Sequence, residues 1–259
     1  MRPIDLSAFP KEREEKLRAI LRYSLFDVML YRASVWDHVQ RVSWIVEELA
    51  RYSADLNIDI EKARVLALVH DDAEMITGDY QAGHKAKMSK DELQKLDVEE
   101  ERAAKKLAAT YPKMVHGYEY ESLLLHSLRK DCDEALLVMY ADKFDAYNET
   151  LHEVLAGNYG FVWSLMFYEQ WFAKYLSKYP RLYRFAAQTS PFILGGDNRH
   201  QPQKVIRAEY VGHGTPHTKE SVKTPSGFAF YNAWRELILR LDSRGERFLT
   251  EQKEFLQQK

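Results

Sequence analysis

The sequence predicts an all-α protein, and two observations lead to this prediction. Glycine does not occur before Gly78, and no proline lies between Pro10 and Pro112 or between Pro112 and Pro180. Because these two residues are the poorest helix formers, their absence leaves room for long helices. Apolar residues also recur every three or four positions, and no strand-type alternation occurs before residue 180.

The predicted helices follow one another along most of the chain. Ser34 and Asp37 resemble a helix capping box with Asp in place of Glu, and the helix that they open carries Val42, Ile45 and Leu49 on one face. Further helices are predicted over residues 12–31, 60–77, 89–110, 118–129, 131–156 and 160–178.

The composition changes towards the C-terminus. Residues 189–230 contain five glycines and four prolines, which predicts an irregular segment with a short strand at "KVIRAEYV". An amphipathic helix is predicted over 230–257, with Trp234 and Leu241 on its apolar face. We therefore expect a helical domain over 1–188 and a C-terminal extension over 189–259 that packs on it.

Composition excludes several classes of protein. A chain of 259 residues can bury one large core or two modest ones. The net charge of −2 gives no reason to expect a nucleic acid or a membrane surface as partner. No apolar run reaches the roughly 18 residues of a membrane span. The one cysteine, Cys132, cannot form an intrachain disulfide, which is typical of a cytoplasmic protein.

Three predicted helices place ionisable side chains where an apolar face is expected. His38 lies four residues before Val42, His70 and Asp71 directly follow a run of apolar residues, and Asp142 shares a face with apolar neighbours. A single such histidine is more often a core residue bonded to the backbone, but aspartate is seldom buried alone. Together they offer two nitrogens and two oxygens, a set that suits a divalent first-row metal ion.

Two more acids follow the His70–Asp71 pair. Glu74 lies four residues after His70, so a continuous helix would place it on the same face. Gly78 indicates that the helix ends, and Asp79 follows from a loop. Acids in these positions can act on a water beside a metal without binding the metal.

These residues carry a resemblance to a known family. His38, His70–Asp71 and Asp142 resemble the H…HD…D signature of the HD-domain metal-dependent phosphohydrolases. The stretch "HDDAEMITGD" is similar to the HDxxExxxGD segment of the 5'-deoxynucleotidases in that superfamily. "SVWDH", "DEALLVMYADKFDAY" and "LAGN" resemble further segments, so the likeness extends over roughly residues 20–175.

The resemblance implies an HD-type helical bundle with one divalent ion, which is Co, Mn, Mg, Fe, Ni or Zn. The implied metal ligands are His38, His70, Asp71 and Asp142, and the implied catalytic acids are Glu74 and Asp79. The expected substrate-binding residues are Arg32, Trp36 and Lys85. Arg22 competes with Arg32 because Arg32 is closer to His38 than the family pattern leads us to expect, and Lys85 can equally be a solvated loop charge.

The implied activity is removal of the 5'-phosphate from (deoxy)nucleoside monophosphates by a metal-activated water, in a homodimer. One alternative is a nucleoside triphosphate or guanosine polyphosphate hydrolase, which uses the same ligands. Another is a two-metal HD phosphodiesterase or a di-iron oxygenase, in which His84, His116 or His126 would supply ligands. A non-catalytic regulatory protein that binds metal and nucleotide is a further alternative, but it would have no need of both Glu74 and Asp79.

Overall fold

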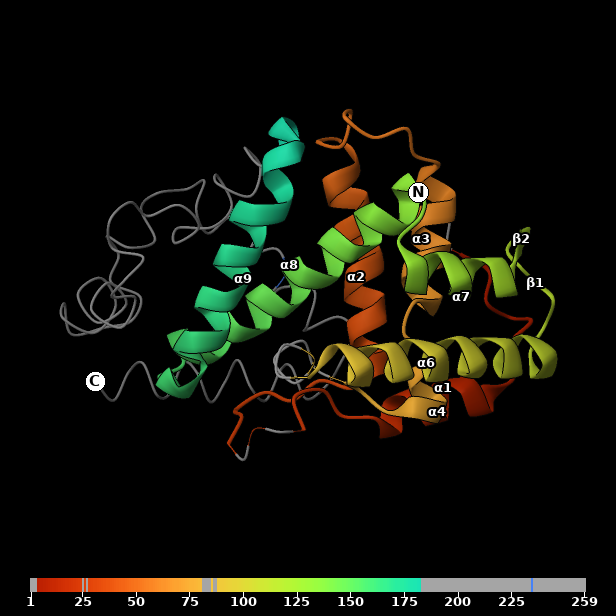
Figure 1. Ribbon diagram of the computed structural model, residues 1–259, viewed down its shortest axis with the longest axis horizontal. Coiled ribbons are helices and arrows are strands. Elements are labelled where there is room, and N and C mark those ends of the chain that lie inside the picture. The colour runs from red at the N-terminus through yellow and green to blue at the C-terminus, as the bar shows by residue number, and fades with distance from the viewer. Residues whose placement is uncertain are drawn as a thin grey trace. The chain divides into compact units, whose positions relative to one another are not determined.

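The computed structural model describes residues 4–24, 26, 28–80, 85, 88–182 and 234, and this part of the chain is predominantly helical (Figure 1). This confirms the all-α prediction. The helices are α1 (Lys11–Ala19), α2 (Val35–Ala50), α3 (Ile60–Val69), α4 (Glu74–Thr77), α6 (Lys90–Thr110), α7 (Tyr120–Arg129), α8 (Asp133–Leu155) and α9 (Val162–Tyr175). The short 3-10 helices η1 (Tyr159–Phe161) and η2 (Leu176–Lys178) flank α9.

The chain forms two compact units. The first contains Met1–Asp27, Arg32–Arg51 and Leu56–Asp142, and the second contains Val28–Tyr31, Tyr52–Asp55 and Lys143–Lys259. Helix α8 begins in the first unit and continues into the second. The domain boundary expected at 188 stays a prediction. The predicted strand, the terminal helix except for Trp234, and His84 lie outside the described residues.

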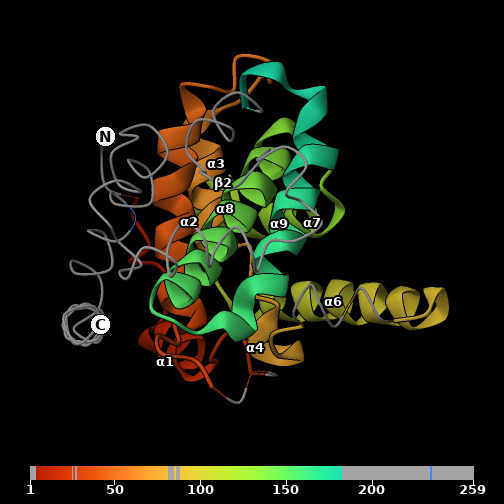
Figure 2. The same cartoon turned by 90° about the vertical axis from the view of Figure 1, so that its left-hand side faces the viewer.

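Helices α2 and α3 pack side by side at the centre of the first unit (Figures 1 and 2). The predicted capping box is confirmed, since the Ser34 hydroxyl accepts a hydrogen bond from the Asp37 amide and the Asp37 carboxylate accepts one from the Ser34 amide. Asp59 caps α3 by accepting bonds from the amides of Glu61 and Lys62. The two helices bury apolar side chains: Val42, Ile45, Val46, Leu49, Ala63, Leu66 and Ala67.

The predicted helix over 12–31 is wrong beyond Ala19, where α1 ends. The chain instead pairs with the segment that precedes α2, through a β-bridge between Leu21 and Ser34. The amide of Arg22 donates to the Ala33 carbonyl at 3.0 Å. This pairing places Arg22 beside the beginning of α2, the helix that carries His38.

The predicted helix over 60–77 is also wrong, because α3 ends at Val69 and α4 begins at Glu74 after the turn formed by residues 70–73. In a continuous α-helix the Asp72 amide would donate to the Leu68 carbonyl. It donates to the Val69 carbonyl instead, at 3.0 Å. The Leu68 carbonyl accepts a hydrogen bond from the Arg13 guanidinium at 2.6 Å, so a distant side chain occupies the place of the missing helical bond.

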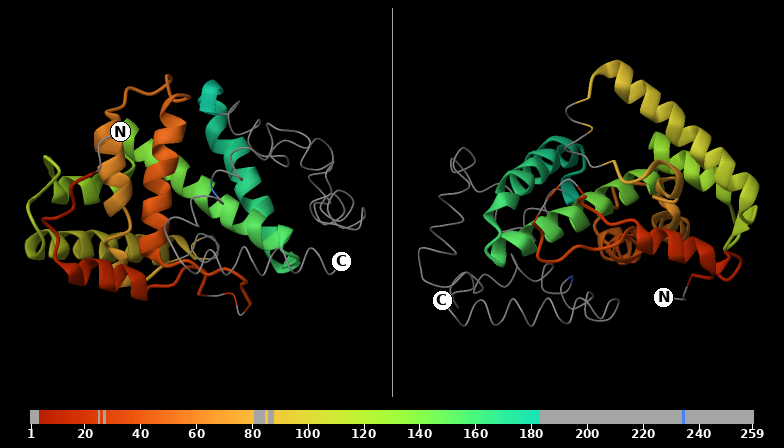
Figure 3. Two further views of the ribbon diagram at one scale, coloured as in Figure 1. Left: turned by 180° about the vertical axis from the view of Figure 1, so that it is seen from behind. Right: turned by 90° about the horizontal axis from the view of Figure 1, so that it is seen from below.

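Helices α6 and α7 lie alongside each other in the first unit (Figures 1 and 3). A two-stranded antiparallel sheet of β1 (Met114–Val115) and β2 (Tyr118–Glu119) connects them, and the sequence did not predict it. Its turn contains Gly117 with a φ of 87°, a conformation that suits glycine. Strands of two residues are too short to show an alternating pattern in the sequence.

The second unit has an aromatic core, and buried carboxylates in it accept hydrogen bonds. The rings of Phe144 and Phe172 stack at 4.4 Å, and the Trp234 indole donates to the Asp145 carboxylate at 2.6 Å. The Glu153 carboxylate accepts hydrogen bonds from the amides of Leu30 and Tyr31, at 2.9 and 2.7 Å. In the described part of the chain, no helix has the length and the apolar character needed to cross a membrane.

Candidate metal centre

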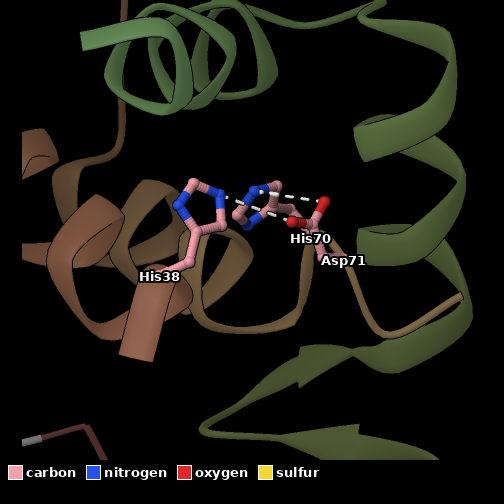
Figure 4. Close-up of side chains that lie close together, drawn as sticks. All are labelled: His38, His70 and Asp71. Carbon is pink, nitrogen blue, oxygen red and sulfur yellow. Dashed lines mark ion pairs between the residues drawn. The ribbon is translucent and has the colours of Figure 1, made fainter. Parts of the chain in front are cut away.

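The structure brings His38, His70, Asp71 and Asp142 together within the first unit. His38 Nε2, from α2, lies 3.4 Å from Asp71 Oδ2 and 3.3 Å from Asp142 Oδ1 on α8. His70 Nε2 lies 3.3 Å from Asp71 Oδ1. Figure 4 shows both imidazole rings directed at the Asp71 carboxylate. The group of His38, His70 and Asp71 has its donor atoms within 4.8 Å of one another, a spacing that one ion can bridge.

His70 is in the tautomer that a metal ligand requires. Its Nδ1 lies 2.7 Å from the Ala67 carbonyl oxygen, and because a carbonyl only accepts, Nδ1 carries the proton. Nε2 is therefore the atom with the lone pair, and it is buried without a hydrogen-bond partner. Burial lowers the pKa of His70, which keeps the imidazole neutral. A buried nitrogen left in this state fits a site that binds a cation.

Asp71 keeps its negative charge despite its surroundings. Burial alone would raise the pKa of its carboxyl group. Interactions with neighbouring groups, which include the two imidazoles and the permanently charged Arg22 guanidinium, outweigh burial, so the pKa of Asp71 lies below its usual value. The ionised carboxylate and the neutral His70 form the donor set that a divalent ion prefers.

Glu74 and Asp79 lie next to this donor set and favour the protonated state. Burial, followed by the negative charges of Asp71 and Asp79, raises the pKa of Glu74 well above its usual value. The Glu74 Oε2 atom is buried without a hydrogen-bond partner. Burial also raises the pKa of Asp79, although Arg22 opposes that effect. Gly78, with a φ of 77°, ends α4, and Asp79 follows it near enough to Asp71 and Glu74 for their charges to interact.

The structure places Arg22, rather than Arg32, beside the acidic cluster. Arg22 is buried, and its Nη1 lies 3.9 Å from Asp71 Oδ2. The Arg32 guanidinium donates to the backbone carbonyls of Tyr23 and Phe26 and so holds the loop before α2. The sequence signal for Arg22 was present, but the β-bridge that positions it joins segments that a sequence pattern does not connect.

Trp36 and Lys85 have structural partners. Trp36 packs with Met75 against a buried cluster that includes Leu17, and the Arg18 guanidinium lies 5.4 Å from the centre of its ring. The Lys85 ammonium forms an ion pair of 2.7 Å with Glu100 on α6. Neither contact is with the four clustered residues.

Neither of the two alternative histidine ligands that the structure describes belongs to the His38–His70–Asp71 group. His116, in the β1–β2 turn, lies 2.9 Å from the Glu61 carboxylate. His126 lies 2.6 Å from Asp131, where Cys132 is a third neighbour.

The sequence reasoning missed the residues that hold the chain around the centre. Arg13 and Tyr120 both bind Asp72, which directly follows the clustered Asp71 and lies two residues before the acid Glu74. The only available signal was the second aspartate in "HDD", which has no role in the motif. The Ser127 hydroxyl also donates to the His70 carbonyl, at 3.0 Å.

A helical unit that gathers two imidazoles and two carboxylates in this order along the chain defines the HD class of metal-dependent phosphohydrolases. Residues 14–188 match the family described as 5'-deoxynucleotidase YfbR-like. The chain belongs to this family, and the recognition made from the motifs is confirmed.

Several solved structures are similar to this chain, among them the following two. A conserved hypothetical protein from Pyrococcus furiosus has 27% sequence identity and a TM-score of 0.50, over 66% of this chain and 92% of its own. An HD-domain phosphohydrolase from Listeria innocua has 19% identity and a TM-score of 0.57, over 75% of this chain and 92% of its own. At that identity the second likeness shows the fold alone. No curated protein matches the chain.

Proposed function

We propose that this protein removes the 5'-phosphate from deoxynucleoside monophosphates and depends on one divalent metal ion. Family membership supports hydrolysis of a phosphate ester. The single observation that carries the proposal is that possible metal ligands and acids with raised pKa values lie together in one cluster. Asp71 and the buried His70 Nε2 form part of a cation-binding set, and the carboxyl groups of Glu74 and Asp79 beside them have raised pKa values.

The residues proposed to hold the ion are His38, His70, Asp71 and Asp142. Two imidazole nitrogens and two carboxylate oxygens suit Mn, Co, Ni, Fe or Zn and are compatible with Mg. When bound, a divalent ion polarises a phosphoryl oxygen and makes a water more acidic.

Glu74 is the proposed general base. A carboxylate whose pKa is raised accepts a proton more readily than an ordinary one, and it must give up its own proton before it acts. Its Oε2, which has no hydrogen-bond partner, is the atom that can receive the proton of the attacking water. Asp79 can orient that water or protonate the leaving 5'-oxygen, because burial raises its pKa as well.

Arg22 is the proposed phosphate-binding cation. A guanidinium can bind two phosphate oxygens at once and stabilise the charge that develops on them. Its position next to Asp71 supports this role. Arg32 is bound to backbone carbonyls, Lys85 to Glu100 and Trp36 to the core, and these contacts favour structural roles for all three.

A screen of nucleoside mono-, di- and triphosphates with Mn²⁺, Co²⁺ and Mg²⁺ tests the proposal. We expect inorganic phosphate from dAMP and other deoxynucleoside monophosphates, and none after chelation. Release of pyrophosphate or triphosphate from triphosphates would support the triphosphate hydrolase alternative. Metal and nucleotide binding without turnover would support the regulatory alternative. The homodimer and the cytoplasmic location stay predictions, and light scattering tests the first.

A further inference from the structure

We propose that Arg13, Asp72 and Tyr120 form a positioning network that fixes the backbone between Asp71 and Glu74. By holding this segment, the network sets the distance between the proposed metal ligand and the proposed base. The inference rests on the proposed function of the site, but the position of the backbone can be measured independently of turnover.

The network is a buried, bidentate ion pair with a third partner. Arg13 Nε donates to Asp72 Oδ2 at 2.8 Å, and Arg13 Nη2 donates to Asp72 Oδ1 at 2.7 Å. The Tyr120 hydroxyl donates to Asp72 Oδ2 at 2.6 Å. Asp72 and Tyr120 are 0% exposed and Arg13 is 1% exposed. Bonds of this length between a planar guanidinium and a carboxylate restrict orientation as well as distance.

Arg13 also determines where helix α3 ends. Its Nη2 donates to the Leu68 carbonyl, which would otherwise accept the Asp72 amide in a continuing helix. The Asp72 amide donates to Val69, and the Glu74 amide donates to Asp71 at 2.9 Å, so each bond spans three residues. The Arg13 guanidinium therefore binds one carbonyl in the last turn of α3, that of Leu68, and the Asp72 side chain in the tighter turn that follows.

The network holds the segment from two sides. Arg13 lies on α1, where its guanidinium is 4.4 Å from the centre of the Phe9 ring. Tyr120 lies at the beginning of α7, and Ser127 on the same helix donates to the His70 carbonyl. Helix α7 thus binds the residue before Asp71 through Ser127 and the residue after it through Tyr120. Helix α1 binds the residue after Asp71 through Arg13, from the other side.

A purely stabilising ion pair would not need this location. The pair of Glu47 on α2 and Arg64 on α3 also joins two helices of the first unit, but neither residue belongs to the segment 70–74. It is therefore a control for the loss of an ion pair between helices, although it is more exposed than the network. If Arg13 and Asp72 act only through stability, the loss of metal affinity in each variant should follow its loss of stability, in Glu47→Gln and in the network variants alike.

Two variants weaken the network to different degrees. Arg13→Lys keeps the positive charge but loses the planar fork that binds Asp72 and Leu68 together. Tyr120→Phe removes one hydroxyl and keeps the ring. For Arg13→Lys we expect Mn²⁺ affinity, measured by electron paramagnetic resonance, and kcat to fall about tenfold, with KM changed less than about threefold. Tyr120→Phe should lower Mn²⁺ affinity and kcat as well, but by less than Arg13→Lys does.

Hydrogen exchange of the metal-free protein measures how firmly the segment is held, independently of turnover. The amides of residues 72–75 should exchange faster in Arg13→Lys than in the wild type, whereas Glu47→Gln should leave them unchanged. The proposal is overturned if Arg13→Lys keeps its Mn²⁺ affinity and exchange pattern within about twofold of the wild type. It is also overturned if Glu47→Gln loses as much Mn²⁺ affinity as Arg13→Lys.

The outcomes separate this proposal from the proposed function. If Arg13→Lys does not fold, Tyr120→Phe gives the decision by the same two measurements. If the wild type hydrolyses no nucleotide, the proposed function fails, and Mn²⁺ affinity and exchange still decide whether the network positions the segment.

Discussion

Asp71 and Asp72 are adjacent in the chain, but their carboxylates enter two different environments. Asp72 is surrounded by donors, since Arg13 and Tyr120 supply three hydrogen bonds to its two oxygens. Asp71 lies among other acids and two imidazoles, and its neighbour Glu74 has a buried oxygen without a hydrogen-bond partner. The Asp72 carboxylate is part of a completed hydrogen-bond network, and the Asp71 carboxylate belongs to a cluster with the donor set of a cation site.

The difference shows how this protein separates stability from function. Buried polar groups in folded proteins are nearly always hydrogen-bonded, and a deficit is costly. Because the folded chain supplies three hydrogen bonds to Asp72, it can surround a buried carboxylate with donors. The deficit two residues away on either side, at His70 Nε2 and Glu74 Oε2, fits a site that binds a ligand.

The largest effect is expected at the unsatisfied side of this comparison. Glu74→Gln should lower kcat by about 10²–10⁴-fold, because it removes the proposed base and keeps the shape. Metal binding should persist, which atomic absorption can measure. A kcat within about fivefold of the wild type would assign the role of base to Asp79 instead.

The difference in stability between Glu74→Gln and the wild type should depend on pH in the metal-free protein. The pKa of Glu74 is raised on folding, so above its usual value of 4.5 the folded state keeps a proton that the unfolded state loses. The contribution of Glu74 to the stability of the wild type therefore falls as pH rises towards the folded pKa, and Glu74→Gln removes this contribution. Urea unfolding at several pH values should show that the stability gained by Glu74→Gln grows with pH. A gain that is constant or shrinks with pH contradicts the prediction.

Asp72→Asn breaks the satisfied side of the comparison. It leaves the buried Arg13 guanidinium without its counter-ion, which should lower the free energy of unfolding by about 3–5 kcal/mol. Glu47→Gln, at a more exposed pair, should cost about 1 kcal/mol or less. Urea unfolding of the metal-free proteins measures both, and equal losses would show that the Asp72 network has no special weight.

Metal binding should remove the deficit around Asp71. An ion at about 100 times its dissociation constant should stabilise the wild type by about 2.7 kcal/mol. His70→Ala and Asp142→Ala should show little of this gain, because each lacks one proposed ligand. Thermal unfolding with and without Mn²⁺ provides the measurement. A variant that gains as much as the wild type does not supply a ligand at that position.

The smallest effect on turnover is expected at Arg32. Arg22→Ala should remove about 1.5–3 kcal/mol of transition-state stabilisation, seen as a lower kcat/KM. Arg32→Ala should leave kcat/KM nearly unchanged and destabilise the loop that it holds. If the two arginines exchange these results, Arg32 is the phosphate-binding residue.

Local signals predicted the helices well. The capping box at Ser34 and Asp37 is confirmed because both partners lie within one turn. The sequence also singled out His38, His70, Asp71 and Asp142, which the structure brings together. Helical spacing and the family motif are enough to select such residues from the sequence.

Long-range contacts account for the errors. The predicted helix over 60–77 ended early because of Arg13, a residue 59 positions before Asp72 in the chain. Arg22 reaches the cluster through a bridge between segments on either side of a loop. Periodicity within a window does not contain either contact, so only the folded chain shows them.

The order of the four proposed ligands along the chain has a consequence for how the protein acquires its metal during synthesis. His38, His70 and Asp71 leave the ribosome with α2 and α3, whereas Asp142 belongs to α8. At about 5–20 residues per second, the roughly 70 residues between Asp71 and Asp142 take about 4–14 s to make. During that interval the nascent chain presents three of the four donors. With these four residues as ligands, capture of the ion at full affinity would wait for α8, and it would be a late event in the maturation of the protein.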